Sequence, residues 1–407
     1  MVTLGYASEV RKAKGLSPKV PPEELENRIQ RCKKLMRKEG FDALLVYGSP
    51  YEPSWIRYLA NVIHPFILSQ SYLLLPLEDN PVLLTDHKFF LSTLKKMTWV
   101  KDVRIYPYVE FPTQFDENIK LFKNLFKELG LESVKIGVCM LDMPATHFKA
   151  LEQALPRATF KDATGLLSEL IETKSPYDCR MIRKAAKIAD KTMETALDGC
   201  EEGKTEYEFG LAAEATAIAH GAEFGMGSTV RTNLCIGSGS EVLANLRPYK
   251  YTAKKLKRGE MFFIDLVVCY NGYYIDFCRT VCVGKPTPKQ KEIFEIVTYM
   301  HQELFKKLKP GVTGGELWDL AYNLARDEGY ENRMNIWIGH GTGISVAEPP
   351  FMVKDNPCPL KKGTFVNIEP GIFLPETVSS AAIEDATFVD GKGAKFVTKC
   401  GRELHIV

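Results

Sequence analysis

The stretch over residues 264–280 limits the fold more than any other part of the chain. Its sequence, Ile-Asp-Leu-Val-Val-Cys-Tyr-Asn-Gly-Tyr-Tyr-Ile-Asp-Phe-Cys-Arg-Thr, places two apolar runs on either side of Asn271-Gly272. Asn-Gly is the dipeptide that most favours the type I′ turn of a β-hairpin, because both turn residues need a positive φ. We therefore predict a hairpin in which Tyr270 pairs with Tyr273.

This register brings two acidic side chains to one face of the hairpin. Asp265 would lie opposite Cys278, and Asp276, two residues from Cys278, would point to the same side as Asp265. The two residues would then be diagonal neighbours, roughly 7–8 Å apart at the backbone. Bare carboxylates among apolar residues repel each other and resist burial, and a bound pair of divalent metal ions would remove both costs. A hairpin whose acids face water is the alternative that this stretch alone leaves open.

Three more candidate metal ligands follow the hairpin. His340 stands in a glycine-rich segment, Glu369 precedes Pro370-Gly371, and Glu384 precedes an aspartate. Four carboxylates and one imidazole form an oxygen-rich set that suits Mn²⁺, Co²⁺, Zn²⁺ or Fe²⁺. The sequence therefore contains enough ligands for a metal centre, in the order Asp, Asp, His, Glu, Glu.

This order resembles that of the pita-bread metallohydrolases, which include methionine aminopeptidase, aminopeptidase P, prolidase and creatinase. The resemblance implies two divalent metal ions held by Asp265, Asp276, His340, Glu369 and Glu384, with Asp276 and Glu384 bridging. It also assigns Glu369 the role of a general base that carries a proton from water to the leaving nitrogen. Two metal ions in such a site activate water and polarise the scissile carbonyl group.

The chain is long enough for two domains. Alternating strand and helix patterns predict an α/β first domain, and it resembles the amino-terminal domain of prolidase and creatinase, which packs in the dimer and leans over the partner's site. Ser175-Pro176 predicts the start of a long helix that ends at Gly199. We expect an α+β protein with a creatinase-like domain over residues 1–165 and a pita-bread catalytic domain over residues 166–407.

Composition excludes several other classes of protein. The chain has 45% apolar and 26% charged residues, as soluble globular proteins do. Its net charge of +2 gives no electrostatic reason to bind nucleic acid or a membrane surface. We find no apolar run of membrane-spanning length and no signal-peptide pattern. The 10 cysteines have no metal-finger spacing and are expected to be reduced thiols, which predicts a cytoplasmic protein.

Three positions depart from the pattern of prolidase and aminopeptidase P. Those enzymes carry a second histidine seven residues past the ligand histidine, where this chain has Ala347. They carry another histidine in the loop before the hairpin, where this chain has Arg247 and its neighbours, and an arginine where it has Ala382. Because those side chains orient a peptide and stabilise the tetrahedral intermediate, we expect poor cleavage of Xaa-Pro peptides. Ala347, with Val346 and Ile344, would instead line a more apolar pocket for a bulkier or cationic small molecule.

We favour hydrolysis of an amide bond in a small peptide or peptide-like substrate, as in an Xaa-Pro dipeptidase or aminopeptidase with a changed subsite. The alternatives are a non-peptide C–N hydrolase similar to creatinase, a lyase similar to the dimethylsulfoniopropionate-cleaving relatives, and a non-catalytic binding module, which the retention of all five ligands disfavours. The resemblance also implies a homodimer. Candidate substrate-binding residues are Arg247, Ala347 and, in a first-domain loop that approaches the partner's site in relatives, His64 and Arg57.

Overall fold

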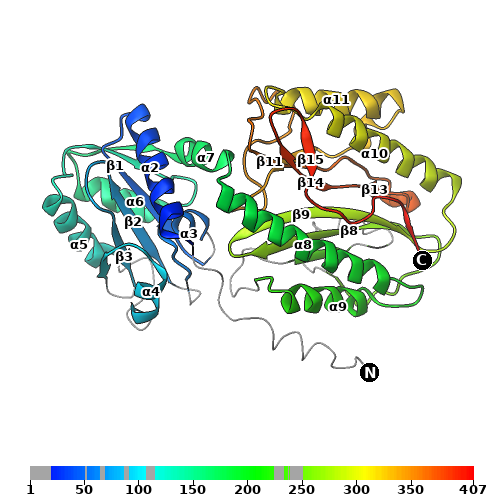
Figure 1. The fold of residues 1–407 in the computed structure, drawn as a ribbon, viewed down its shortest axis with the longest axis horizontal. Coiled ribbons are helices and arrows are strands. Elements are labelled where there is room, and N and C mark those ends of the chain that lie inside the picture. Colours follow the sequence, from blue (N-terminus) through cyan, green and yellow to red (C-terminus); the bar gives the residue numbers. More distant parts are fainter. Residues whose placement is uncertain are drawn as a thin grey trace. The chain divides into compact units, whose positions relative to one another are not determined.

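The computed structural model describes residues 20–50, 53–64, 69–86, 91–106, 115–223, 233–236, 238 and 251–407. These residues form two compact units that divide between Ile171 and Glu172 (Figure 1). The expected boundary between residues 165 and 166 falls inside helix α7 (Thr164–Glu172), whose apolar side is buried. The helix therefore stays with the first unit.

The first unit is built on a six-stranded mixed sheet in the order β4-β3-β2-β1-β5-β6. Strands β2 and β3 form an antiparallel pair, with Leu73 opposite Leu83. Strand β1 is buried along its whole length and pairs with β2 on one side and β5 on the other. Its strands are β1 (Ala43–Gly48), β2 (Ser71–Pro76), β3 (Val82–Thr85), β4 (Asp102–Ile105), β5 (Lys135–Val138) and β6 (Thr159–Asp162). Its helices are α2 (Pro22–Glu39), α3 (Ser54–Ala60), α4 (Leu91–Met97), α5 (Phe115–Glu128), α6 (Ala145–Ala154) and α7.

The second unit contains the predicted long helix α8 (Pro176–Gly199), which begins with the expected capping box between Ser175 and Asp178. Helices α8 and α9 (Glu206–Ala219) lie on one side of the central strands, and α10 (Pro288–Lys307) and α11 (Gly314–Asp327) lie on the other (Figure 1). The sheets have the orders β16-β9-β8-β7, β10-β11-β14-β15 and β12-β13. The strands are β7 (Asn233–Ile236), β8 (Met261–Tyr270), β9 (Tyr273–Cys282), β10 (Gly339–Gly341), β11 (Phe365–Ile368), β12 (Gly371–Ile372), β13 (Ala381–Ala382), β14 (Asp385–Val389), β15 (Ala394–Phe396) and β16 (His405–Ile406).

The predicted hairpin is confirmed with its register. Tyr270 pairs with Tyr273, and Asp265 lies opposite Cys278. The turn residues Asn271 and Gly272 have φ values of 52° and 78°, so both adopt the positive φ that a type I′ turn requires. The local sequence alone therefore determines how the two aspartate-bearing strands align.

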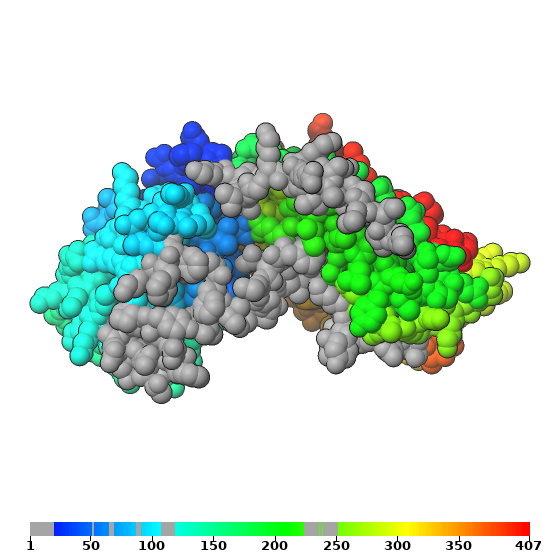
Figure 2. Space-filling model, turned by 90° about the horizontal axis from the view of Figure 1, so that it is seen from below, coloured from blue at the N-terminus to red at the C-terminus, as the bar shows by residue number. Residues whose placement is uncertain are grey.

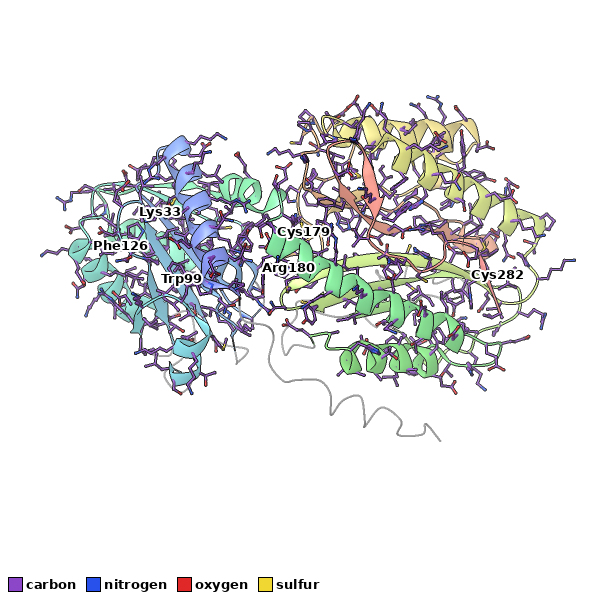
Figure 3. All side chains as sticks on the ribbon, in the orientation of Figure 1. Lys33, Trp99, Phe126, Cys179, Arg180 and Cys282 are labelled. Carbon is purple, nitrogen blue, oxygen red and sulfur yellow. The ribbon has the colours of Figure 1, made fainter. Side chains whose placement is uncertain are left out.

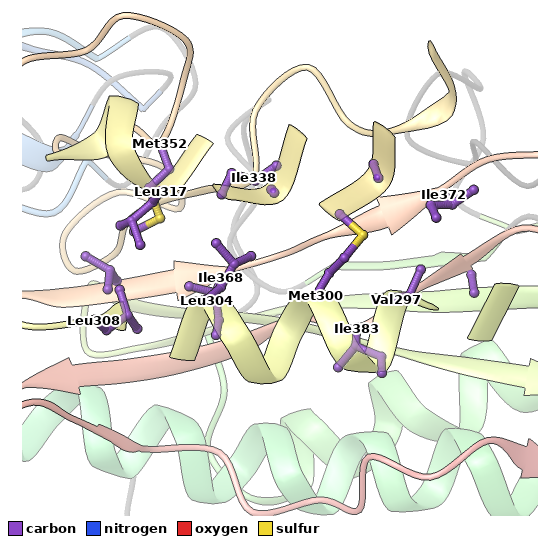
Figure 4. Close-up of a cluster of buried hydrophobic side chains, with 14 of the residues drawn as sticks. Val297, Met300, Leu304, Leu308, Leu317, Ile338, Met352, Ile368, Ile372 and Ile383 are labelled. Atoms are coloured by element: carbon purple, nitrogen blue, oxygen red, sulfur yellow. The ribbon is translucent and has the colours of Figure 1, made fainter. Parts of the chain in front are cut away.

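A continuous apolar core supports the strands that follow the hairpin (Figure 4). Met300 and Leu304 of α10 are fully buried with Ile368 of β11 and Ile383, which precedes Glu384. One expected strand over residues 364–373 is divided into β11 and β12, because the chain leaves the ladder at Pro370, which has no N–H group to donate. The break lies directly after Glu369, whose N–H group still donates to Ile338 O at 3.0 Å.

The described cysteines are free thiols distributed over both units. Cys179 belongs to α8 and Cys282 to the end of β9 (Figure 3), and both are buried. Helix α9 forms part of the surface in Figure 2. Three of its apolar side chains, Tyr207, Leu211 and Ile218, are exposed. Within the described ranges, no helix is both long and apolar enough to cross a membrane.

The buried pair of Tyr72 and His147 in the first unit predicts a dependence of stability on pH. Tyr72 Oη lies 2.5 Å from His147 Nδ1, and burial lowers the pKa of His147 from 6.5 to about 4. The unfolded chain therefore takes up the proton first, so this stability is complete above about pH 6.5 and is lost as the pH falls towards 4. Urea unfolding between pH 7 and pH 4 should show this loss, and His147→Gln should remove it. The control His405→Asn should retain it, and an unchanged pH dependence in His147→Gln would contradict the assignment.

Candidate metal centre

Five acidic or imidazole side chains reach one region of the second unit from five different strand segments. Asp265 comes from β8 and Asp276 from β9, so the hairpin supplies two of them. His340 lies in the middle of β10, while Glu369 follows β11 and Glu384 precedes β14. Because β10, β11 and β14 are neighbours in one sheet, residues far apart in the sequence meet there.

His340 is the centre of the cluster. Its Nε2 atom lies 3.5 Å from Glu369 Oε1, 3.8 Å from Glu384 Oε1 and 4.0 Å from Asp276 Oδ2. One ligand atom from each of Asp276, His340 and Glu384 can be chosen so that all lie within 4.8 Å of one another. These distances fit side chains around a shared cation, since each is longer than a direct hydrogen bond.

The protonation of His340 is fixed by the backbone. Its Nδ1 atom lies 2.9 Å from the carbonyl oxygen of Gly341, which can only accept, so Nδ1 carries the proton. Burial lowers the pKa of His340 below its usual value, so the ring is neutral and Nε2 presents a lone pair to the carboxylates. This is the tautomer and orientation that a metal-binding histidine needs.

The carboxylates cannot all be charged without a counter-ion. Burial raises the pKa of Asp276 well above its usual range, and the charges of Glu384, Asp265 and Glu369 raise it further. Burial also raises the pKa of Glu384, with Glu369 and Asp265 adding to it, and burial followed by Asp265 raises the pKa of Glu369. The cluster therefore lacks positive charge among the described side chains that touch it.

Two buried oxygen atoms test whether this set suits a metal ion. Asp276 Oδ1 and Glu369 Oε1 are shielded from solvent and accept no hydrogen bond from the described residues. Buried acceptors are normally satisfied, so these two oxygens have unused capacity. With the neutral imidazole of His340, they offer the hard, mixed oxygen and nitrogen donors that divalent metal ions bind.

Asn367 orients two of the predicted ligands and was not among the residues predicted from the sequence. It is fully buried in β11 opposite His340. Its Nδ2 donates to Glu384 Oε1 at 2.8 Å and to the carbonyl oxygen of Asp276 at 3.0 Å. The alternation of side chains along a strand could have found it, because a residue two positions before Glu369 faces the same side.

A buried arginine holds the backbone of the hairpin and of the Glu384 segment together. Arg279 Nη1 donates to the carbonyl oxygens of Cys278 and Glu384, each at 2.7 Å, and its Nη2 donates to Asp385 Oδ1 at 2.9 Å. Burial acts to raise the pKa of Asp385, but Arg279, then His301 and Arg402, outweigh it and hold that pKa well below its usual range. This network lies on the other side of the chain from the Glu384 carboxylate and fixes the backbone that carries it.

The cluster lies at a pocket of about 570 Å³. Asp265, Glu369 and Glu384 line it, and most of the remaining lining is apolar. Ala382, which stands where prolidase relatives carry an arginine, also lines the pocket. The other lining residues are Phe263, Cys278, Met334, Asn335, Ile336, Trp337, Val353 and Phe373.

Ala347, Val346 and Ile344, which we expect to line a substrate pocket, lie outside the described lining of this one, so that expectation stays a prediction. None of them is among the described lining residues, and Val346 packs against a small cluster that contains Tyr274. Tyr274 N donates to Gly343 O at 2.7 Å, which ties this segment to the hairpin near its turn. The apolar wall of the pocket described above comes from other segments of the chain.

The remaining candidate substrate-binding residues stay predictions. Arg247 lies outside the described residues. Arg57, half-buried in α3, and His64, which is buried, belong to the first unit, whereas the metal-ligand candidates belong to the second. His220 stands at the end of α9, where its Nδ1 lies 2.9 Å from the carbonyl oxygen of Thr216.

Comparisons with known proteins agree with the sequence resemblance. The chain matches Metallopeptidase family M24 over residues 180–390 and the Creatinase/Prolidase N-terminal domain over residues 28–170. It is similar to the Xaa-Pro dipeptidase of Pyrococcus horikoshii, with 28% identity over 93% of this chain and 99% of the relative. The Xaa-Pro dipeptidase of Pyrococcus furiosus is 32% identical over 73% of this chain and 80% of its own length.

Solved structures give the same result for the fold. The crystal structure of the prolidase from Pyrococcus horikoshii OT3 superposes with a TM-score of 0.78 at 28% identity and covers 93% of this chain and 99% of that one. The expected creatinase-like domain and pita-bread domain are therefore confirmed as the fold of this chain. On its sequence and its structure, the protein belongs to metallopeptidase family M24.

Proposed function

We propose that Asp265, Asp276, His340, Glu369 and Glu384 hold two divalent metal ions and that the protein uses them to hydrolyse an amide bond. The convergence of Asp276, Glu369 and Glu384 around His340 Nε2, beside a pocket that Glu369 and Glu384 line, carries this proposal. Such ions, whether Mn, Co, Zn or Fe, would activate water and polarise the scissile carbonyl. Asp276 and Glu384 would bridge them, and Glu369 would act as the general base.

Glu369 has the surroundings of a proton carrier. Burial raises the pKa of its carboxyl group, so a proton taken from water is held more readily than on an exposed glutamate. Its backbone is fixed from both sides, because its N–H donates to Ile338 O at 3.0 Å and its carbonyl oxygen accepts from Asn335 Nδ2 at 2.9 Å. A base held in this way can deliver the proton to a leaving nitrogen without moving its main chain.

A small peptide or peptide-like molecule is the proposed substrate. The similarity to relatives named Xaa-Pro dipeptidase along nearly the whole chain supports this class. The small side chain of Ala382 in the pocket wall favours a changed subsite. It also keeps a second candidate open, a creatinase-like hydrolase that cleaves a C–N bond outside peptides.

The two candidates differ in their expected turnover of Xaa-Pro substrates. Ala347 replaces an imidazole that prolidase relatives place beside the scissile carbonyl, and losing one such donor costs about 10²–10³ in turnover. We expect the Mn²⁺- or Co²⁺-loaded protein to cleave Xaa-Pro dipeptides and tripeptides poorly. Assays of a peptide panel, with Ala347→His as the variant expected to gain activity, test this. Turnover equal to that of an ordinary prolidase would show that another group supplies the donor.

We also propose that the protein is a homodimer in the cytoplasm. The resemblance to prolidase and creatinase, whose amino-terminal domain packs in the dimer, supports the assembly, and the free thiols support a reducing compartment. Sedimentation at micromolar concentration should give twice the mass of one chain. A fully active monomer under those conditions would contradict the dimer.

A further inference from the structure

One buried ion pair of the second unit involves none of the five candidate ligands. Lys174 stands between α7 and α8, and its Nζ donates to Glu348 Oε1, in the segment that follows β10. The two side chains are only 3% and 2% exposed. Because burying two charges costs about as much as their attraction returns, stability alone does not explain such a pair. The contacts of Glu348 indicate another role.

The carboxylate of Glu348 closes the loop over residues 341–348. Its Oε2 accepts the N–H groups of Ile344 at 3.1 Å and Ser345 at 3.3 Å. At the base of the loop, Gly341 N donates to Glu348 O at 2.7 Å, and Glu348 N donates to Gly341 O at 2.9 Å. Glu348 therefore holds the loop at its base through the main chain and across its interior through the side chain.

Gly343 shows how closely the loop packs around the ion pair. A β-carbon at this position would lie 2.8 Å from Glu348 Oε1 and 2.8 Å from Lys174 Cε, closer than real side chains approach. The carbonyl oxygen of Gly343 accepts from Tyr274 N at 2.7 Å, so the hairpin holds the loop as well. The glycine is needed here because the pair fills the space that a side chain would take.

The backbone pair at the base of the loop also positions His340. Gly341 O accepts from His340 Nδ1 as well as from Glu348 N, each at 2.9 Å. The contact with Nδ1 fixes the neutral tautomer and leaves Nε2 facing the candidate ligands, 3.5 Å from Glu369 Oε1. Because the carbonyl oxygen that orients the imidazole is itself held by Glu348, the position of Glu348 determines the direction of Nε2.

Lys174 is itself fixed by its neighbours. Its N–H group donates to Gly363 O at 3.0 Å, and the next residue, Ser175, is the N-cap of α8. Burial raises the pKa of Glu348, and the charge of Lys174 is the strongest influence that lowers it. Without Lys174, the buried carboxyl group would take up a proton more readily, which turns one of its acceptor oxygens into a donor.

We propose that Lys174 and Glu348 are positioning residues that hold Gly341 O against His340 Nδ1 and so aim His340 Nε2 at the bound metal ion. The inference rests on the proposed metal centre and adds to it two residues that are not ligands. Partners that orient a ligand in this way typically contribute about 10–100-fold to metal affinity. Removing the pair should therefore weaken metal binding although every ligand remains.

Metal affinity is the first test. Calorimetric titration of the full-length, metal-free protein with Mn²⁺ should show about 10–100-fold weaker binding in Glu348→Gln than in the parent. Glutamine keeps the size of the side chain but offers only one acceptor oxygen to Lys174 and the loop. The matched control is Glu24→Gln, which removes the carboxylate of a buried ion pair with Arg28 in the first unit and should leave the affinity unchanged. Parent-like affinity in Glu348→Gln would overturn the proposal.

The tautomer of His340 is the second test, and a merely structural role would not change it. Nitrogen NMR of the histidine-labelled, metal-free protein distinguishes a proton on Nδ1 from a proton on Nε2, and His340→Gln identifies the signal. The parent should carry the proton on Nδ1, as the contact with Gly341 O requires. Glu348→Gln should shift part of the population to the other tautomer. Weaker Mn²⁺ binding with an unchanged His340 signal would overturn the route through Gly341.

Changes at Lys174 assign the effect to the pair. Lys174→Met should lose about as much Mn²⁺ affinity as Glu348→Gln. The double variant, Lys174→Met with Glu348→Gln, leaves neither charge of the pair buried alone, so it remains informative if a single variant unfolds. Because both residues act through one contact, it should bind Mn²⁺ more weakly than the parent but no more weakly than Glu348→Gln. Parent-like binding, or a loss equal to the sum of the two single losses, would overturn the proposal.

The inference and the proposed function can fail separately. A parent chain that binds no Mn²⁺ would overturn the function, and the His340 signal of the metal-free protein would still show whether the pair orients the imidazole. A parent chain that binds Mn²⁺ and cleaves peptides would support the function. If Glu348→Gln then kept the same affinity and the same His340 signal, the inference alone would be wrong.

Discussion

Replacing Glu369 by glutamine is expected to lower kcat by about 10²–10⁴, the usual contribution of a general base. Glutamine keeps the size of the side chain and one ligand oxygen, but it cannot take up a proton. The effect should be in kcat rather than in KM, because Glu369 lies at the candidate metal ligands, 3.5 Å from His340 Nε2, rather than in the apolar wall. The assay is steady-state hydrolysis of the best peptide found in the panel, at saturating Mn²⁺.

Metal loss must be separated from loss of the base in this experiment. The metal content of Glu369→Gln should be measured beside its activity, and the rate compared at equal occupancy. The matched control is Glu376→Gln, which removes a half-exposed carboxylate that pairs with Arg333 and should leave kcat unchanged. A Glu369→Gln protein with full metal occupancy and a kcat within about tenfold of the parent would remove the general-base role.

The sequence predicts the parts of the fold that depend on neighbouring residues. Asn271-Gly272 sets the hairpin turn, and Ser175, Pro176 and Asp178 set the start of α8, and both are confirmed. In each case the information lies within four residues, where turn and capping chemistry act directly on the backbone. Because the register of the hairpin follows from the turn, the turn residues are enough to place the two aspartates on one face of the hairpin.

Features that depend on contacts distant in sequence could not be predicted in this way. Arg279 bonds to backbone atoms of residues more than a hundred positions later, at Glu384 and Cys400. Its charge in an apolar strand gives no signal of those partners. The pocket wall is a second example, because residues 334–337 line the pocket but precede a strand of only three residues, and their own sequence does not indicate that position.

The strand break at Pro370 depends on the local sequence, whereas the contacts of the residues beside it depend on segments distant in the sequence. The pattern over residues 364–373 predicts one strand. In the structure this strand is interrupted at Pro370, which separates β11 from β12. The proline alone does not predict the contacts of the residues before it, where Asn367 pairs with His340 of β10 and Glu369 donates its N–H group to Ile338 O. Those two residues then serve different purposes on the same face, one as a candidate ligand and base and the other as the donor that orients Glu384.

The central claim is that one cluster of five side chains holds two metal ions and that Asp276 is shared between them. Asp276 is buried within 4.0 Å of His340 Nε2, and its pKa is raised by burial and then by Glu384, Asp265 and Glu369, so it has the other candidate carboxylates around it. Asp265 is more open and lines the pocket. Removing a shared ligand should therefore affect both ions, whereas removing Asp265 should affect mainly one.

The deciding measurement is the metal content of purified protein by elemental analysis, for the parent chain, Asp276→Ala and Asp265→Ala prepared in parallel with excess Mn²⁺ and then desalted. Circular dichroism of each sample checks that the fold is intact. We expect about two ions per chain in the parent, about one in Asp265→Ala and almost none in Asp276→Ala, which should also be inactive. Near-full occupancy in folded Asp276→Ala would contradict the shared ligand, and a parent chain that binds no divalent metal would contradict the whole account.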